Sequence, residues 1–192
     1  MSQELHNIDR PEDEKKYTKQ ELDKFMVFCL LDTSVPYEKC CEAFNALNDA
    51  GMTTRKKLRN HTPLPIKLEL QSVGYRWANQ KSKYLHEFAH NDIDLKTATR
   101  DEIVKNIKGV GMKLASMFLR NTRGHQYAVI DIHTDRWIQK NFGVPDDKYK
   151  KMSYEQKEEW FIQASELLGK TPMELDLEIW QENRIGNRNG KK

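Results

Sequence analysis

The sequence predicts an all-α protein, and three observations favour this fold class. Capping boxes, in which a Ser or Thr and a Glu or Gln three positions later satisfy the first amides of a helix, begin at Thr18, Thr99 and Ser153. Apolar residues follow each box at helical spacing, and no segment shows convincing strand alternation. Hydrophobic residues make up 38% of the 192 residues, which is enough to form a packed core.

The first half of the chain predicts five helical segments. Proline suits the first turn of a helix and glycine its left-handed end, so these residues mark several of the boundaries. In order, we expect a helix after Thr18, a helix between Pro36 and Gly51, a short helix over 53–60, a segment from Pro63 to Gly74 and a helix from about Trp77 to Ala89.

The second half predicts further helices around one glycine-rich turn. The helix after Thr99 runs to Ile107, and a new helix follows the turn almost at once. The expected segments are a helix over 100–107, a helix from Met112 to about Asn121, a helix that resumes after Asp131, a helix over 153–168 and a helix from Thr171 to Trp180. We expect the polar tail 187–192 to be unstructured, or ordered only by a ligand.

Composition excludes several classes of protein. No apolar run approaches the roughly 20 residues of a membrane-spanning helix, and residues 1–16 lack the apolar core of a secretory signal. The three cysteines form no CxxC pair, so we expect no metal site, iron–sulfur cluster or disulfide framework. The net charge of +3 permits nucleic-acid binding without identifying it. We expect a soluble cytoplasmic protein, associated with the nucleoid or acting in a host cell if it is viral.

The most informative segment is the turn Lys108-Gly109-Val110-Gly111 between two helices. Two glycines allow a tight turn and leave the first amides of the next helix unobstructed. Such amides, with the helix dipole, can bind a phosphate. A plain tight corner between helices is the alternative interpretation.

Two ionisable residues follow this turn. Lys113 shares a helix face with Ser116 and Arg120, whereas most lysines in a helix are simply solvated. Asp131 directly follows three apolar residues, Ala128, Val129 and Ile130. It can cap the next helix, serve as a partly desolvated carboxylate at a site, or do both.

The turn KGVGMK, the continuation LAS and the downstream VIDIH together resemble the helix-hairpin-helix DNA glycosylase superfamily, which includes endonuclease III. The compact length, Gly74-Tyr75-Arg76 and the C-terminal region most resemble the archaeal-type 8-oxoguanine DNA glycosylase/AP lyase family. This resemblance implies a two-lobed fold with a central cleft and no iron–sulfur cluster. One lobe would span 32–125, with the helix-hairpin-helix at about 100–121, and the other would combine 1–31 with 126–192.

The resemblance also implies a reaction. A bifunctional glycosylase/lyase would flip out and excise a damaged base, 8-oxoguanine in this family, through a Schiff base on Lys113 followed by β-elimination. Asp131 would stabilise the positive charge that develops on the sugar. A neutral amine is required, so burial or a neighbouring cation, such as Lys108 or Arg120, would have to lower the pKa of this lysine from about 10.4.

Further residues are assigned by the same resemblance. Those expected to bind the DNA backbone are Lys108, Gly109, Val110, Gly111, Arg120 and His133. An ordinary histidine in the first turn of a helix, with no contact to DNA, is an equal alternative for His133. Thr33 and Ser34 occupy the loop where relatives usually present an Asn or Gln to fill the gap left by the flipped base. Trp77 would stack on a base or belong to the core, and the terminal Lys192 would help to recognise the base.

The expected partner is double-stranded DNA with a damaged base, bound by a monomer. No cofactor is expected to be required; a monovalent cation between the hairpin backbone and a DNA phosphate is the accessory ion that we consider. Two alternatives stay open at this point. The chain could be a glycosylase for another base, such as uracil, mismatched thymine, an oxidised pyrimidine or a modified viral base, or it could be a non-catalytic DNA-binding module. A metabolic helical enzyme is disfavoured because no paired carboxylates, nucleotide loop or metal cluster are present.

Overall fold

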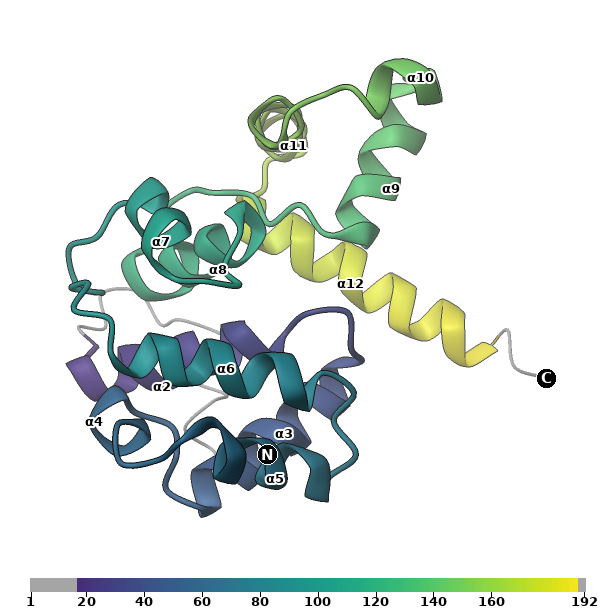
Figure 1. Cartoon of the computed structure of the whole chain (residues 1–192). Helices are drawn as coiled ribbons and strands as arrows, with labels where there is room; N and C mark the ends of the chain where they lie inside the picture. The colour runs from purple at the N-terminus through teal and green to yellow at the C-terminus, as the bar shows by residue number, and fades with distance from the viewer. Residues whose placement is uncertain (1–16, 190–192) are drawn as a thin grey trace. The chain divides into compact units, whose positions relative to one another are not determined.

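The computed structural model describes residues 17–189, with side chains described up to Asn183, and this part of the chain is all helical. Figure 1 labels its eleven helices. They are α2 (Lys19–Leu31), α3 (Tyr37–Asp49), α4 (Arg55–Leu58), α5 (Pro63–Ser72), α6 (Ala78–Ala89), α7 (Arg100–Asn106), α8 (Met112–Arg123), α9 (Ile132–Phe142), α10 (Asp146–Tyr149), α11 (Tyr154–Leu167) and α12 (Pro172–Asn189). The all-α prediction is therefore confirmed.

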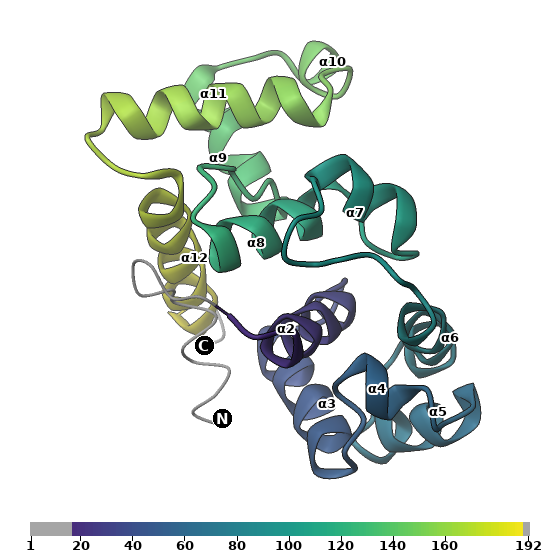
Figure 2. The same cartoon turned by 90° about the vertical axis from the view of Figure 1, so that its left-hand side faces the viewer.

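The chain divides into two compact units, Met1–Gly124 and His125–Lys192. The first unit contains α2 to α8 and the second contains α9 to α12. The expected division places α2 in the lobe that contains the C-terminal segment, whereas in the structure α2 belongs to the first unit. This helix is buried from Phe25 to Leu31, and it packs against α3, α6 and α8 of the first unit (Figures 1 and 2).

The core of the first unit forms around α2. Phe25 is fully buried, and its ring stacks on Phe118 of α8 with 6.0 Å between the ring centroids. Nine of the thirteen residues of α2 are buried, which is typical of a helix enclosed by its neighbours. Burying a large apolar side chain contributes about 1.5–3 kcal/mol, so α2 fixes the positions of the helices that surround it.

A buried ion pair joins α2 to α4. Asp23 accepts hydrogen bonds from the Arg55 backbone amide at 3.0 Å and from Arg55 Nε at 2.7 Å. The guanidinium also donates to the carbonyls of Asn91 and Ile93, at 3.1 and 2.7 Å. Because both charged groups are satisfied by several partners, the pair avoids the cost of an isolated buried charge. It anchors the segment that follows α6.

The second unit has a core of its own. Trp137 of α9 packs edge-on against Phe161 of α11, with 5.8 Å between their centroids. The buried apolar residues of this core are Ala128, Ile138, Tyr149, Phe161, Leu175 and Ile179. They come from α9 to α12 and from the segment that precedes α9, so Asp131 lies between Ala128 and a helix that contributes to this core.

Most helix boundaries agree with the sequence. The capping boxes at Thr18, Thr99 and Ser153 are all present, which confirms those three predictions. The C-terminal helix is different, because α12 continues to Asn189 instead of ending near Trp180. No proline follows Trp180, so nothing prevents the helix from propagating. Lys192 lies outside the described residues. None of the described helices is long and apolar enough to cross a membrane.

Candidate functional site

The turn between α7 and α8 forms a tight helical hairpin. Val110 is buried, and its amide donates to the Ile107 carbonyl at 3.1 Å. Gly109 adopts a φ of +89°, and a Cβ atom there would lie 2.3 Å from Cδ2 of Tyr84 on α6. Glycine is therefore required at this position by both the backbone conformation and the ring beneath it.

The backbone at the start of α8 has open space around it, unlike the backbone at Gly109. Gly111 is the N-cap residue of α8, and no side chain caps the helix there. Its φ of −101° suits any residue, and a Cβ atom would meet nothing within 4 Å. The first amides of a helix have no partners within the helix. The described structure therefore leaves this helix start suited to an anion such as a phosphate.

Lys113 is the second residue of α8, directly beyond the hairpin. Its Nζ donates to Asp32 Oδ2 at 2.8 Å, and the two side chains are 31% and 22% exposed. Asp32 is the C-cap residue of α2, 81 positions earlier in the chain. The amine is thus held by a carboxylate while it retains access to solvent.

A buried lysine of α6 holds the loop that follows α2 through a hydrogen bond. Lys81 of α6 is only 2% exposed, and its Nζ donates to Thr33 Oγ1 at 3.0 Å. Ser34 is exposed and has a φ of +54°, an uncommon conformation for a residue other than glycine. Of the two residues in the loop where relatives fill the base gap, Thr33 therefore accepts a hydrogen bond from Lys81, whereas Ser34 is exposed.

Burial dominates the electrostatics around this loop. It lowers the pKa of Lys81 from 10.5 to about 8, partly opposed by the nearby Asp32 and Cys40. It also raises the pKa of the Cys40 thiol and of the Tyr75 hydroxyl, which donates to the Leu31 carbonyl at 2.6 Å. The side chains of Lys81, Lys113 and Asp32 thus lie near Cys40 and Tyr75, which stay neutral near neutral pH.

Sequence reasoning missed Asp32 and Lys81 as members of this cluster. A signal for Lys81 was available, because it lies on the buried face of α6 with Ala78, Ser82 and Leu85. A lysine on the apolar face of a helix needs a partner inside the protein. Asp32 had a weaker signal, as a carboxylate directly after the apolar sequence of α2.

Asp131 lies in the second unit as the N-cap residue of α9. Its Oδ1 accepts hydrogen bonds from the amides of His133 and Thr134, at 2.7 and 3.0 Å. The hydrogen bonds found for its side chain among the described residues all involve Oδ1, including one from Thr134 Oγ1 at 3.2 Å. The carboxylate also lines a cavity of about 440 Å³ whose other lining residues are Ile130, Ile132, Asp135, Tyr154 and Lys157. Asp131 therefore caps a helix and faces a cavity.

The other expected DNA-binding residues are placed unevenly. Lys108 is largely exposed and pairs with Glu87 at 3.0 Å. Arg120 is only 8% exposed, and its Nε donates to the Asn121 side chain at 3.2 Å, so it lies inside the first unit rather than along a surface track. His133 is half-buried, and its Nδ1 has no hydrogen-bond partner among the described residues.

Trp77 is the N-cap residue of α6 and is partly exposed. The guanidinium of Arg76 lies over its ring, 4.6 Å from the centroid. Its Nε1 is buried without a hydrogen-bond partner in the described part of the chain. The arrangement is compatible with both expectations for this residue, stacking on a base and packing in the core.

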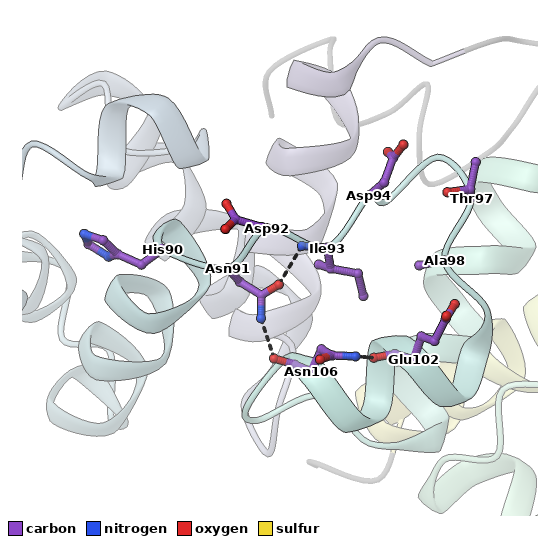
Figure 3. Close-up of a pocket in the computed structure, with 9 residues that line it drawn as sticks. All are labelled: His90, Asn91, Asp92, Ile93, Asp94, Thr97, Ala98, Glu102 and Asn106. Atoms are coloured by element: carbon purple, nitrogen blue, oxygen red, sulfur yellow. Dashed lines mark hydrogen bonds between the residues drawn. The ribbon is translucent and has the colours of Figure 1, made fainter.

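A further cavity, of about 520 Å³, lies where the chain passes from α6 to α7 (Figure 3). Asn91 braces it, because its side chain donates to the Asn106 carbonyl at 2.6 Å and accepts from the Ile93 amide at 2.8 Å. Asp92, Asp94 and Glu102 contribute carboxylates to the lining. Negative charge disfavours a phosphate here, so this cavity does not extend the anion site of the hairpin.

Comparisons with known proteins identify the family of this chain. A family model described as 8-oxoguanine DNA glycosylase matches residues 8–170. The 8-oxoguanine DNA glycosylase/AP lyase of Thermoplasma acidophilum is 30% identical over 177 residues, which cover 87% of this chain and 82% of the relative.

Two solved structures share the fold. The 8-oxoguanine DNA glycosylase of Thermotoga maritima superposes with a TM-score of 0.69 and 24% identity, covering 93% of this chain and 86% of that chain. The 8-oxoguanine glycosylase/lyase of Methanocaldococcus jannaschii, in complex with a 15mer DNA containing 8-oxoguanine, has a TM-score of 0.69 and 26% identity, covering 92% and 87%. Since the family model matches most of the chain, the protein belongs to the 8-oxoguanine DNA glycosylase family.

Proposed function

We propose that this protein is a bifunctional DNA glycosylase/AP lyase that excises 8-oxoguanine from double-stranded DNA. The observation that carries the proposal is Lys113, a partly exposed amine at the second residue of α8, directly after an uncapped helix start. A phosphate held by the amides of that start would bring the sugar of a flipped nucleotide within reach of an amine on the same helical turn.

The chemistry assigned to Lys113 follows from this position and from the family. The neutral amine attacks C1′ of the flipped nucleotide, and the bond to the base breaks with its electron pair leaving on the base. The attached nitrogen loses a proton, and its electron pair forms the C1′=N bond of the Schiff base as the C1′–O4′ bond breaks and the ring oxygen takes up a proton. The Schiff base makes the C2′ proton acidic, so removal of that proton expels the 3′ phosphate by β-elimination. Asp131 supplies the negative charge that stabilises the developing cationic sugar, and its Oδ2 is the oxygen that the helix cap does not use.

Contacts to the DNA backbone are proposed for the hairpin and its surroundings. Gly109 and Gly111 would offer backbone amides on either side of the buried Val110, whose own amide bonds to the Ile107 carbonyl, and Lys108 adds an exposed charge beside them. His133, which is half-buried in the first turn of α9, is proposed as a further phosphate contact. A monovalent cation between the hairpin carbonyls and a phosphate is an accessory we propose with them. We propose that the protein acts as a monomer in the cytoplasm, associated with the nucleoid or, if it is viral, inside a host cell.

The experiment that tests the function is a panel of duplexes carrying 8-oxoguanine opposite each normal base, uracil, thymine glycol or a T·G mismatch. Released base and cleaved strand are measured separately under single-turnover conditions. We expect the fastest release from the 8-oxoguanine duplexes, with strand cleavage following. Faster release of another base would make that base the substrate instead of 8-oxoguanine. DNA binding without release of any base would indicate a non-catalytic DNA-binding module.

A further inference from the structure

A nucleophilic lysine must lose a proton before it can attack. The pKa of a free lysine is about 10.4, so the amine is an ammonium at neutral pH unless a nearby group takes its proton. A candidate proton acceptor has to lie within hydrogen-bond distance of the nitrogen. The structure provides one, because Asp32 Oδ2 lies 2.8 Å from Lys113 Nζ.

We propose that Asp32 is the proton acceptor of Lys113, an inference that rests on the function proposed above. One N–H bond of the Lys113 ammonium breaks and its electron pair remains on Nζ. The proton forms an O–H bond with Asp32 Oδ2, which leaves a neutral amine beside a neutral carboxylic acid. The lone pair on Nζ is then free to attack C1′.

The position of Asp32 supports this role. It caps the C-terminus of α2, where the helix carries a partial negative charge, so a carboxylate at this point depends on cationic neighbours. Lys113 on α8 and Lys81 on α6 are those neighbours. Both side chains of the Asp32–Lys113 pair are largely shielded from solvent, and expulsion of the remaining water by DNA favours the neutral pair over two opposite charges.

The titratable groups that face Asp32 come from each helix packed around α2. Cys40 of α3 and Tyr75, which precedes α6, both have a raised pKa because they are buried, so they stay neutral near neutral pH. Lys81 has a pKa of about 8 and is charged below that pH. Among Cys40, Tyr75 and Lys81, Lys81 is therefore the group whose charge changes nearest to neutral pH. It acts as a positioning residue through its hydrogen bond to Thr33.

The test compares the wild type with Asp32→Asn on duplex DNA containing an abasic site. Covalent trapping by borohydride is followed under single-turnover conditions from about pH 6 to about pH 9.5. An abasic site removes base excision from the measurement, so the rate reports formation of the Schiff base. Asp49→Asn is the matched control, because Asp49 is an exposed aspartate at the C-terminal end of α3 in the same unit.

We expect Asp32→Asn to lower the trapping rate about 100-fold near pH 7, the usual scale of a lost acid–base group. The deficit should shrink as the pH rises, because hydroxide then deprotonates Lys113 directly. Asp49→Asn should match the wild type at every pH. Asp32→Glu keeps a carboxylate and should be faster than Asp32→Asn at pH 7.

Several results would overturn the inference. An equal loss at every pH, or no rescue by Asp32→Glu, would indicate that Asp32 serves only the structure of the loop. A faster Asp32→Asn variant would show that the ion pair restrains Lys113. These results leave the proposed function intact, provided that the wild type traps. A wild type that forms no covalent complex with abasic DNA would overturn the proposed function together with the inference.

Discussion

At the scale of single residues, the two oxygens of Asp131 have different surroundings. Oδ1 accepts the hydrogen bonds that cap α9, whereas none of those found among the described residues uses Oδ2. Capping needs only an acceptor, and asparagine is as good as aspartate in this role. Stabilising a cationic sugar needs a negative charge. The observed capping role of Asp131 and its proposed catalytic role can therefore be separated by substitution.

We expect Asp131→Asn to keep the stability of the second unit within a few tenths of a kcal/mol, and Asp131→Ala to lose about 1 kcal/mol. Both variants should excise 8-oxoguanine about 100-fold more slowly. Urea unfolding and single-turnover excision measure the two effects. Wild-type excision by Asp131→Asn would remove the carboxylate from the mechanism.

Lys81 predicts a dependence of stability on pH. Its pKa in the folded protein is about 8, below its ordinary value of 10.5. Between these values the unfolded chain holds a proton that the native state has lost, so a rise in pH favours folding. Below about pH 8 both states are charged, and the native state bears the full cost of burying the charge. Lys81→Met lacks this titration.

The free energy of unfolding should therefore rise in the wild type relative to Lys81→Met between about pH 8 and about pH 10. Urea unfolding at several pH values measures the difference between the two proteins, and groups that titrate in both cancel out. A difference that stays constant over this range would mean that Lys81 titrates normally.

At the scale of elements, the two glycines of the hairpin differ in whether the fold requires glycine at their positions. Gly109 has a positive φ and lies against the Tyr84 ring, whereas Gly111 has an ordinary φ and open space around it. The fold therefore explains the glycine at position 109 but not the glycine at position 111. A ligand that approaches the backbone closely is a sufficient reason for the second.

We expect Gly109→Ala to destabilise the first unit by about 1–3 kcal/mol, the usual cost of strain and overpacking. Gly111→Ala should fold as the wild type does and bind duplex DNA more weakly. Thermal unfolding and fluorescence anisotropy with labelled DNA distinguish the two effects. If Gly111→Ala bound DNA at full strength, no phosphate would approach that amide closely.

The sequence predicted the elements better than their pairings. The boxes at Thr18, Thr99 and Ser153 are local patterns of four residues, so they could be found without a structure. The contacts of Lys113 with Asp32 and of Lys81 with Thr33 join residues 81 and 48 positions apart. Helix packing decides which residues meet at such separations, and no local pattern encodes it. The length of α12 was also missed, since the expected stop lacked a proline or glycine signal.

At the scale of the whole molecule, the net charge is only +3, so attraction to DNA depends on where the cations lie. Arg120 is turned into the first unit, although its spacing from Lys113 suggested a shared exposed face. Helical spacing fixes which residues share a face but not whether that face meets solvent. Lys108 is exposed at the hairpin, so a substitution there measures the contribution of one cation to DNA affinity.

DNA affinity should fall as salt concentration rises, because bound cations release counterions from the phosphates. Lys108→Gln should reduce the steepness of this dependence by about one unit of log Kd per log salt concentration. Lys148→Gln, which removes an exposed lysine from α10, is the control and should leave the slope unchanged. An unchanged slope in Lys108→Gln would place the hairpin lysine away from the DNA.

The most direct test of the central claim is borohydride trapping on a duplex with 8-oxoguanine, comparing the wild type, Lys113→Gln and the control Lys105→Gln. Peptide mass spectrometry of the trapped complex identifies the modified amine. The account predicts a covalent complex on Lys113 in the wild type and the control, and none in Lys113→Gln, which should still bind DNA. A complex that persists in Lys113→Gln, or one mapped to another lysine, would contradict the assignment of the nucleophile.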